Sequence, residues 1–307
     1  MEINNLNIND TINLSRRTQV PLGEFEGLLI ECPRDAMQGW PHFIATEKKI
    51  KYLNELLKCG FDTLDFGSFV SPKAIPQMAD TAEVVRKLEL SSTNTKLLAI
   101  VANERGATDA ICYDQIFYLG FPFSISETFQ QRNTNSSVDE SIKRVENIQE
   151  LCIKNKKELV VYISMGFGNP YGDTYNEEIV INRTKQIEGL GVKIISIADT
   201  VGQATAKEVN ILMKTLMPEF ANIVLGVHLH SLPAHREEKI EAALDAGCKR
   251  FDAAIKGIGG CPMAGNDLVG NMDTEIMVHH LEKKGYQINI DKSALQKCSM
   301  LAAEIFV

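Results

Sequence analysis

Eight short apolar runs alternate with longer amphipathic segments along this chain, and that alternation restricts the fold more than any other feature. The runs lie at residues 27–31, 63–66, 97–101, 115–120, 159–164, 193–198, 223–230 and 250–255. Segments with helical spacing of apolar residues lie between and after them, at 46–59, before Lys87, near Ala107, and at 138–155, 176–188, 204–217, 234–246, 273–284 and 292–305. Regular alternation of strands with helices is typical of parallel sheets covered by helices.

A (β/α)8 barrel fits this alternation best. The 307 residues, 44% of them hydrophobic, suffice for one barrel-sized domain, and no change in composition marks a second one. An open dinucleotide-binding sheet is the alternative, but no G-x-G-x-x-G follows the first run, and the main glycine cluster follows the eighth. We therefore predict a single α/β domain, a TIM barrel over residues 26–307, with a flexible arm at residues 1–25 and an extra C-terminal helix.

Charge and cysteine content limit the partners and the compartment. A formal net charge of −8 argues against a nucleic acid or an anionic membrane as partner. No apolar run approaches the roughly 20 residues that a membrane helix needs. Seven cysteines without a C-x-x-C pair are typical of a reducing compartment, and the Asn- and Asp-rich N-terminus lacks the apolar stretch of a signal peptide. We expect a cytoplasmic protein.

Polar side chains gather where the apolar runs end. In a (β/α)8 barrel the carboxyl ends of the strands meet at one face, where the loops build the reaction centre. The candidates at this face are Arg34, Asp35 and Gln38 after the first run, Asp65 in the second, Tyr162 in the fifth, Asp199 after the sixth, His228 and His230 in the seventh, and Cys261 after the eighth.

His228 and His230 lie two residues apart, so a strand there directs both imidazoles to the same side. Two imidazole nitrogens can bind a divalent metal ion when oxygen ligands arrive from other strands. Paired histidines on a strand also occur as ordinary hydrogen-bonded residues, so this pattern by itself leaves both interpretations open.

Several segments resemble one enzyme family. ECPRDAMQ at 31–38 is similar to the opening motif of 3-hydroxy-3-methylglutaryl-CoA (HMG-CoA) lyases, GSFVSPKAIPQMAD at 67–80 to their second-strand segment, and GIGGCPMAG at 257–265 to their glycine loop with the catalytic cysteine. The Arg-Asp and His-x-His pairs also mark a wider group of metal-dependent barrel lyases and Claisen-type condensing enzymes. The resemblance covers roughly residues 25–300, with the motifs in the same order.

The resemblance implies a divalent metal, Mg²⁺ or Mn²⁺, bound by Asp35, His228, His230 and Asn271. It also implies that Arg34 stabilises an enolate during cleavage of a carbon–carbon bond, and that Cys261 delivers a proton to the enolate carbon. The general base is either His228 or Asp35, and the sequence does not decide between them. The supporting residues, around the substrate or the ligands, are then Gln38, Asp65, Tyr162, Asp199 and Glu275.

On this resemblance we expect a lyase that converts HMG-CoA, or a close 3-hydroxy-3-alkyl acyl-CoA, to acetyl-CoA and a β-keto acid such as acetoacetate. We also expect a homo-oligomer, a dimer. The alternatives are a condensing enzyme or aldolase that acts on a 2-oxo acid, and a non-catalytic acyl-CoA binding module.

Some positions depart from the family motifs. Ser231-Leu232 stand where Asp-Thr is usual, Cys32 and Ala36 replace glycines, and the segment from Cys261 to Asn271 is one residue longer. These departures do not affect the expected metal ligands but alter the pocket wall. The sequence therefore leaves open a different 3-hydroxy-3-alkyl acyl-CoA as substrate.

Overall fold

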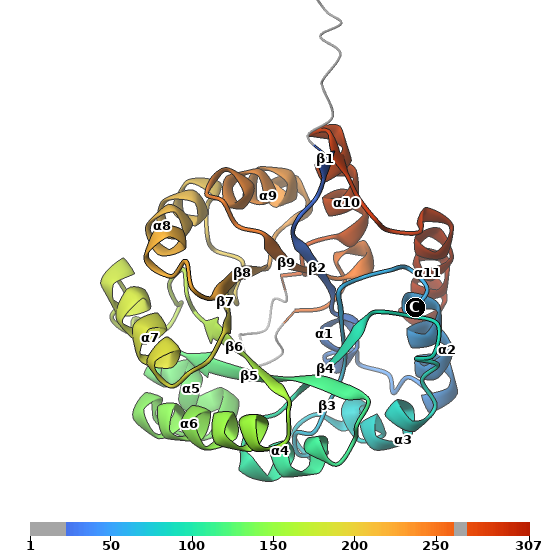
Figure 1. Cartoon of the computed structure of the whole chain (residues 1–307), viewed down its shortest axis with the longest axis horizontal. Helices are drawn as coiled ribbons and strands as arrows, with labels where there is room; N and C mark the ends of the chain where they lie inside the picture. Colours follow the sequence, from blue (N-terminus) through green and yellow to red (C-terminus); the bar gives the residue numbers. More distant parts are fainter. Residues whose placement is uncertain (1–22, 261–268) are drawn as a thin grey trace, which may run out of the picture.

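The computed structural model describes residues 23–260 and 269–307, which form a closed barrel of parallel strands. Each strand is hydrogen-bonded to its neighbours in chain order, and the last pairs with the first (Figure 1). The strands are β2 (Leu28–Glu31), β3 (Thr63–Ser68), β4 (Lys96–Ile100), β5 (Ile116–Ser124), β6 (Glu158–Ser164), β7 (Ile194–Asp199), β8 (Val224–Leu229) and β9 (Arg250–Ala253). All eight predicted runs are strands, which confirms the (β/α)8 barrel.

Helices form a ring around the strands, as Figure 1 shows in the view along the barrel. They are α1 (Pro33–Gln38), α2 (Thr46–Leu56), α3 (Thr81–Arg86), α4 (Glu104–Ile111), α5 (Glu127–Thr134), α6 (Val138–Lys154), α7 (Glu177–Gly189), α8 (Ala206–Glu219), α9 (Arg236–Asp245), α10 (Thr274–Lys283) and α11 (Lys292–Ile305). The last is the predicted extra C-terminal helix, and it packs against α2. Among the described residues, no helix combines the length and apolar character needed to span a bilayer.

The side chains of β8 alternate between the core outside the strands and the interior of the barrel. Leu225, Val227 and Leu229 are buried in the core between the barrel and the helices. Since neighbouring side chains in a strand point to opposite faces, His228 points into the barrel, and this is the condition for a site at the barrel mouth.

The short helices α1 and α5 have no counterpart among the segments with predicted helical spacing. Local signals account for both. α1 begins with Pro33, whose fixed φ suits a first helical position. α5 begins after Ser126, whose hydroxyl accepts a hydrogen bond from the Phe129 N–H. Both helices lie at the face of the barrel that carries the candidate site.

The N-terminal segment joins the outside of the barrel. β1 (Gly23–Glu24) pairs in parallel with β10 (Tyr286–Gln287), and the ring of Phe25 packs edge-on against Tyr286 at 5.4 Å between centroids. Residues 1–22 of the predicted arm lie outside the described chain, so the flexible arm stays a prediction.

Candidate active site

A cavity of about 410 Å³ lies at the carboxyl ends of the strands. The predicted residues that line it are Arg34, Asp35, Gln38, Tyr162, His228 and His230. They come from α1, from β6 and from the end of β8, which are far apart in the sequence. The barrel therefore brings most of the predicted site together, as its topology requires.

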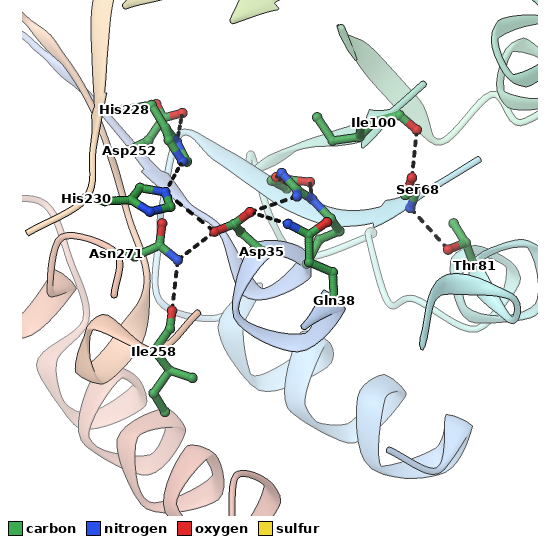
Figure 2. Close-up of polar contacts among 12 residues, drawn as sticks. Asp35, Gln38, Ser68, Thr81, Ile100, His228, His230, Asp252, Ile258 and Asn271 are labelled. Atoms are coloured by element: carbon green, nitrogen blue, oxygen red, sulfur yellow. Dashed lines mark hydrogen bonds and ion pairs between the residues drawn. The ribbon is translucent and has the colours of Figure 1, made fainter. Parts of the chain in front are cut away.

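Asp35, His228 and His230 form a compact group of possible metal ligands. One ligand atom from each lies within 4.8 Å of the other two. The two histidine Nε2 atoms are 3.2 Å apart, and His230 Nε2 lies 3.9 Å from Asp35 Oδ2 (Figure 2). A carboxylate and two imidazoles that face one point match the donors of a divalent cation site.

Asn271 belongs to the same group. Its backbone forms an isolated bridge with His230, and its side-chain amide donates to Asp35 Oδ2 at 2.8 Å and to the Ile258 carbonyl at 2.8 Å. Figure 2 shows the amide oxygen on the side of His230. The predicted fourth ligand therefore lies beside the other three.

Both histidines are oriented through their Nδ1 atoms. His228 Nδ1 lies 3.2 Å from Asp252 Oδ2, and His230 Nδ1 lies 3.1 Å from the Val269 carbonyl oxygen. Both Nε2 atoms are thereby directed toward Asp35. The Val269 carbonyl holds His230 without the carboxylate that the family motif usually places directly after it.

The protonation states suit a cation. Burial raises the pKa of Asp35, but the charges of Arg34, His230 and His228 outweigh burial and lower it to about 2. Burial, together with the neighbouring His228, lowers the pKa of His230 to about 4. Near neutral pH Asp35 is thus an ionised carboxylate and His230 a neutral imidazole, which are the forms that bind metal. Burial lowers the pKa of His228, but its contact with Asp252 outweighs burial and raises that pKa, so a metal there displaces a proton more readily at alkaline pH.

Arg34 links the metal-ligand group to β3. Its Nε and Nη2 donate to Asp65 Oδ2 at 3.0 and 2.5 Å, and its Nη1 donates to Asp35 Oδ1 at 2.9 Å. Gln38 donates to the same Asp35 oxygen at 2.7 Å. Burial raises the pKa of Asp65 to about 6 even though Arg34 opposes the rise. The guanidinium is thus fixed at one wall of the cavity and has further N–H groups for a ligand.

Tyr162 lines the cavity opposite the α1 residues. Its ring meets the His228 ring edge-on, with 5.7 Å between centroids. Its buried hydroxyl has no hydrogen-bond partner among the described residues. A buried unpaired hydroxyl is costly, so this group is a candidate to bind a polar substrate atom.

Asp199 is not brought to the cavity. Its carboxylate accepts hydrogen bonds from the backbone N–H groups of Gln203 and Ala204 and from Lys239 Nζ, each at 3.0 Å. Lys239 also donates to the backbone carbonyl of His230 at 3.0 Å. Asp199 therefore supports the backbone around His230 rather than the substrate.

Glu275 also lies away from the described cavity lining. It accepts a hydrogen bond from the Lys256 N–H at 2.8 Å and so holds the segment before the glycine loop against α10. Its predicted supporting role around the substrate or the ligands stays a prediction.

Cys261 lies outside the described residues, so its predicted role stays a prediction. Gly259, two residues earlier, lies against the metal-ligand group: a Cβ there would approach Asn271 Nδ2 to 2.5 Å and the Asp35 carbonyl oxygen to 2.8 Å. Gly259 also has a φ of +110°, which side-chain-bearing residues rarely adopt. The chain can pass this close to the group only with glycine at this position.

Two buried charged residues next to the site have no counterpart in the sequence prediction: Arg250 and Asp252. Arg250 and Asp252 are separated by two positions in an apolar run, which places both inside the barrel. That spacing indicates that both side chains point into the barrel, but it does not indicate their partners. The register of β8 and β9 places Asp252 opposite His228.

Comparisons with known proteins identify a matching family and a similar fold. The family model described as HMGL-like matches residues 30–301. Hydroxymethylglutaryl-CoA lyase YngG of Bacillus subtilis is 31% identical over 84% of this chain and 85% of its own length. The cytoplasmic 3-hydroxy-3-methylglutaryl-CoA lyase of mouse is 29% identical over 89% of this chain and 79% of its own length.

A solved HMG-CoA lyase of Acinetobacter baumannii, in complex with coenzyme A and 3-methylmalate, has a similar fold. Its TM-score is 0.84, with 30% identity and coverage of 91% of both chains. The solved Bacillus subtilis HMG-CoA lyase has a TM-score of 0.86, with 29% identity over 91% of this chain and 93% of that one.

Proposed function

Because this chain belongs to the HMGL-like family, we propose that it is a carbon–carbon lyase that cleaves HMG-CoA to acetyl-CoA and acetoacetate. The observation that carries this proposal is the group of Asp35, His228 and His230 beside the Arg34 guanidinium, within one cavity. An acyl-CoA substrate agrees with the coenzyme A bound by the similar Acinetobacter structure. A condensing enzyme or a simple binding module has no comparable support.

We propose that Asp35, His228, His230 and Asn271 hold a divalent metal, Mg²⁺ or Mn²⁺. The donor set fits a hard cation that keeps open positions for substrate. When bound, such a metal supplies Lewis acidity that lowers the pKa of a coordinated hydroxyl.

Cleavage begins with loss of the proton from the tertiary hydroxyl. The C–O⁻ electrons then form the ketone of acetoacetate as the C2–C3 bond breaks, and the bond's electron pair becomes the enolate of acetyl-CoA. Arg34 lies at the cavity wall with N–H groups left over from its contacts with Asp65 and Asp35, and it stabilises the enolate oxygen.

The base that accepts the hydroxyl proton is His228 or Asp35, and both are also proposed to hold the metal. Both Asp35 oxygens already accept hydrogen bonds, from Arg34, Gln38 and Asn271. His228 Nδ1 faces Asp252 and its Nε2 is the atom directed to the metal, so His228 accepts the proton only when Nε2 is released from the metal. Cys261 then donates a proton to the enolate carbon and completes acetyl-CoA.

The test is incubation of the protein with HMG-CoA and Mg²⁺ or Mn²⁺, with both products identified by mass spectrometry. We expect equal amounts of acetyl-CoA and acetoacetate. Parallel incubation with acetyl-CoA and a series of 2-oxo acids tests the condensing alternative. Intact HMG-CoA together with a condensation product would replace the lyase by that alternative.

In the same assay, Cys261→Ser should slow product formation by about 10² to 10⁴, the range for a positioned proton donor.

We propose a cytoplasmic location and a dimer. The matched relatives include proteins named as cytoplasmic and as mitochondrial, so the location rests on the sequence expectation. Size-exclusion chromatography with light scattering tests the dimer.

A further inference from the structure

A buried ion pair lies inside the barrel next to the proposed metal ligands. Arg250 and Asp252 are both on β9, with 3% and 2% of their surfaces exposed. Arg250 Nη1 donates to Asp252 Oδ1 at 2.7 Å. Two charges are seldom buried in a barrel that could be filled by apolar side chains, so this pair needs an explanation beyond packing.

The second Asp252 oxygen reaches His228. Asp252 is paired with His228 across β8 and β9, and its Oδ2 lies 3.2 Å from His228 Nδ1. Figure 2 shows Asp252 behind the His228 ring, on the side opposite His230. The carboxylate therefore bridges the guanidinium and the imidazole with one oxygen for each.

Several neighbours hold Arg250 in this position. Its Nη1 also donates to Ser196 Oγ at 3.1 Å, and its guanidinium lies 5.8 Å from the centre of the Tyr162 ring. Gly226 makes room for the side chain, since a Cβ there would approach Arg250 carbons to 2.9 Å. The barrel interior is thus shaped around Arg250.

The contact with Asp252 decides which His228 nitrogen carries the proton. A carboxylate accepts hydrogen bonds, so Nδ1 is the donor and, in the neutral ring, Nε2 keeps its lone pair. That lone pair faces His230 and Asp35, where the metal is proposed to bind. Outer carboxylates that fix metal-bound histidines in this way typically contribute 10-fold to 100-fold in metal affinity.

We propose that Asp252 and Arg250 are positioning residues of the metal site. Asp252 holds His228 in the Nδ1–H tautomer, with Nε2 directed to the metal, and Arg250 holds Asp252 in the geometry that makes this contact. Arg250 also balances the charge of Asp252, so the pair acts through orientation rather than by adding negative charge. This inference rests on the metal site of the proposed function.

The alternative is that the pair only fills the barrel interior. In that case its removal would lower stability and leave the His228 tautomer and the metal affinity unchanged. The His228 tautomer and the metal affinity therefore distinguish a positioning role from a packing role.

The experiment measures the tautomer and metal binding directly. In metal-free protein labelled with ¹⁵N-histidine, at an alkaline pH above the raised pKa of His228, the His228 signals, assigned with His228→Gln, should show a protonated Nδ1 and an unprotonated Nε2. Asp252→Asn should abolish this single tautomer, because an amide can both donate and accept. Its Kd for Mn²⁺ alone, measured by electron paramagnetic resonance, should rise about 10-fold to 100-fold. The kcat for cleavage should fall, with KM for the acyl-CoA nearly unchanged.

Arg250→Met tests the other half of the pair and should shift the tautomer in the same direction. Asp80→Asn is the matched control, since it breaks the Lys49–Asp80 ion pair of 2.8 Å away from the cavity. It should lower stability but change neither the tautomer nor the Kd for Mn²⁺.

An Asp252→Asn protein with the wild-type tautomer and Mn²⁺ affinity would overturn the inference, even if Arg250→Met does not fold. The tautomer and Mn²⁺ readouts do not require turnover. A wild-type protein that shows both expected readouts but leaves HMG-CoA intact would therefore refute the proposed function and not this inference.

Discussion

At the scale of single residues, the planar fork of Arg34 is central to the proposed reaction. Three of its N–H groups are used by Asp65 and Asp35, and the fork leaves others for the enolate oxygen. An ammonium group keeps the charge but cannot contact both carboxylates and a ligand in one plane. Arg34→Lys should therefore lower kcat by about 10² to 10³, as for loss of an oxyanion donor, with a smaller change in KM.

Steady-state kinetics of Arg34→Lys checks this, with the exposed Arg86→Lys as a control for the substitution itself. Thermal unfolding of both proteins shows whether each is folded. A folded Arg34→Lys protein with nearly normal kcat would give Arg34 a structural role.

Several site residues could be predicted individually from the sequence because they follow the carboxyl ends of the strands, which meet at one face of the barrel. His228, His230 and Asp35 are examples. Asp252 could not, since its importance comes from a contact across two strands and no motif marks it. The resemblance assigns supporting roles to Asp199 and Glu275. Asp199 binds two backbone N–H groups and Lys239, Glu275 binds the Lys256 N–H, and neither residue lines the cavity.

At the scale of elements, Glu31 ties the end of β2 to the segments around the glycine loop. Its two oxygens accept hydrogen bonds from Thr274 Oγ1 at 2.5 Å and from the Ile255 N–H at 2.9 Å. Complete burial raises its pKa from 4.5 to about 8. The folded protein therefore binds this proton more tightly than the unfolded chain does.

Such a raised pKa makes stability depend on pH in a defined direction. The contribution of Glu31 is fully present below about pH 4.5 and is lost as the pH rises to about 8. Glu31→Gln keeps the shape without a titrating proton. We expect it to gain stability relative to the wild type across this window, measured by urea unfolding at a series of pH values. Parallel stability curves for the two proteins would show that Glu31 does not titrate in this way.

The long elements could be predicted because their periodicity is strong, and α11 has the predicted bounds. In the segment after β8, the contacts that support His230 could not be predicted from the motif. Ser231 replaces the usual aspartate, and the support of His230 comes instead from the Val269 carbonyl and from Lys239. Both partners lie in other segments, so only the folded chain reveals them.

At the scale of the whole molecule, the closed barrel explains why residues from position 34 to position 230 can line one cavity. The strand order could be predicted from the alternation of runs. The register could not, although it sets which inward-facing side chains meet, as with His228 and Asp252. The interior of the barrel is apolar near β4 and β6, around Leu98 and Val160, and charged near β8 and β9.

The most direct test of the account is acetyl-CoA release from HMG-CoA while Mn²⁺ is returned to protein treated with a chelator. Bound Mn²⁺ is counted in parallel by electron paramagnetic resonance. Two imidazoles, a carboxylate and an amide should hold a hard cation reversibly. We predict no release without metal, and release that rises in proportion to a single bound Mn²⁺ per chain. Undiminished release from metal-free protein, or full Mn²⁺ binding without release, would contradict the account.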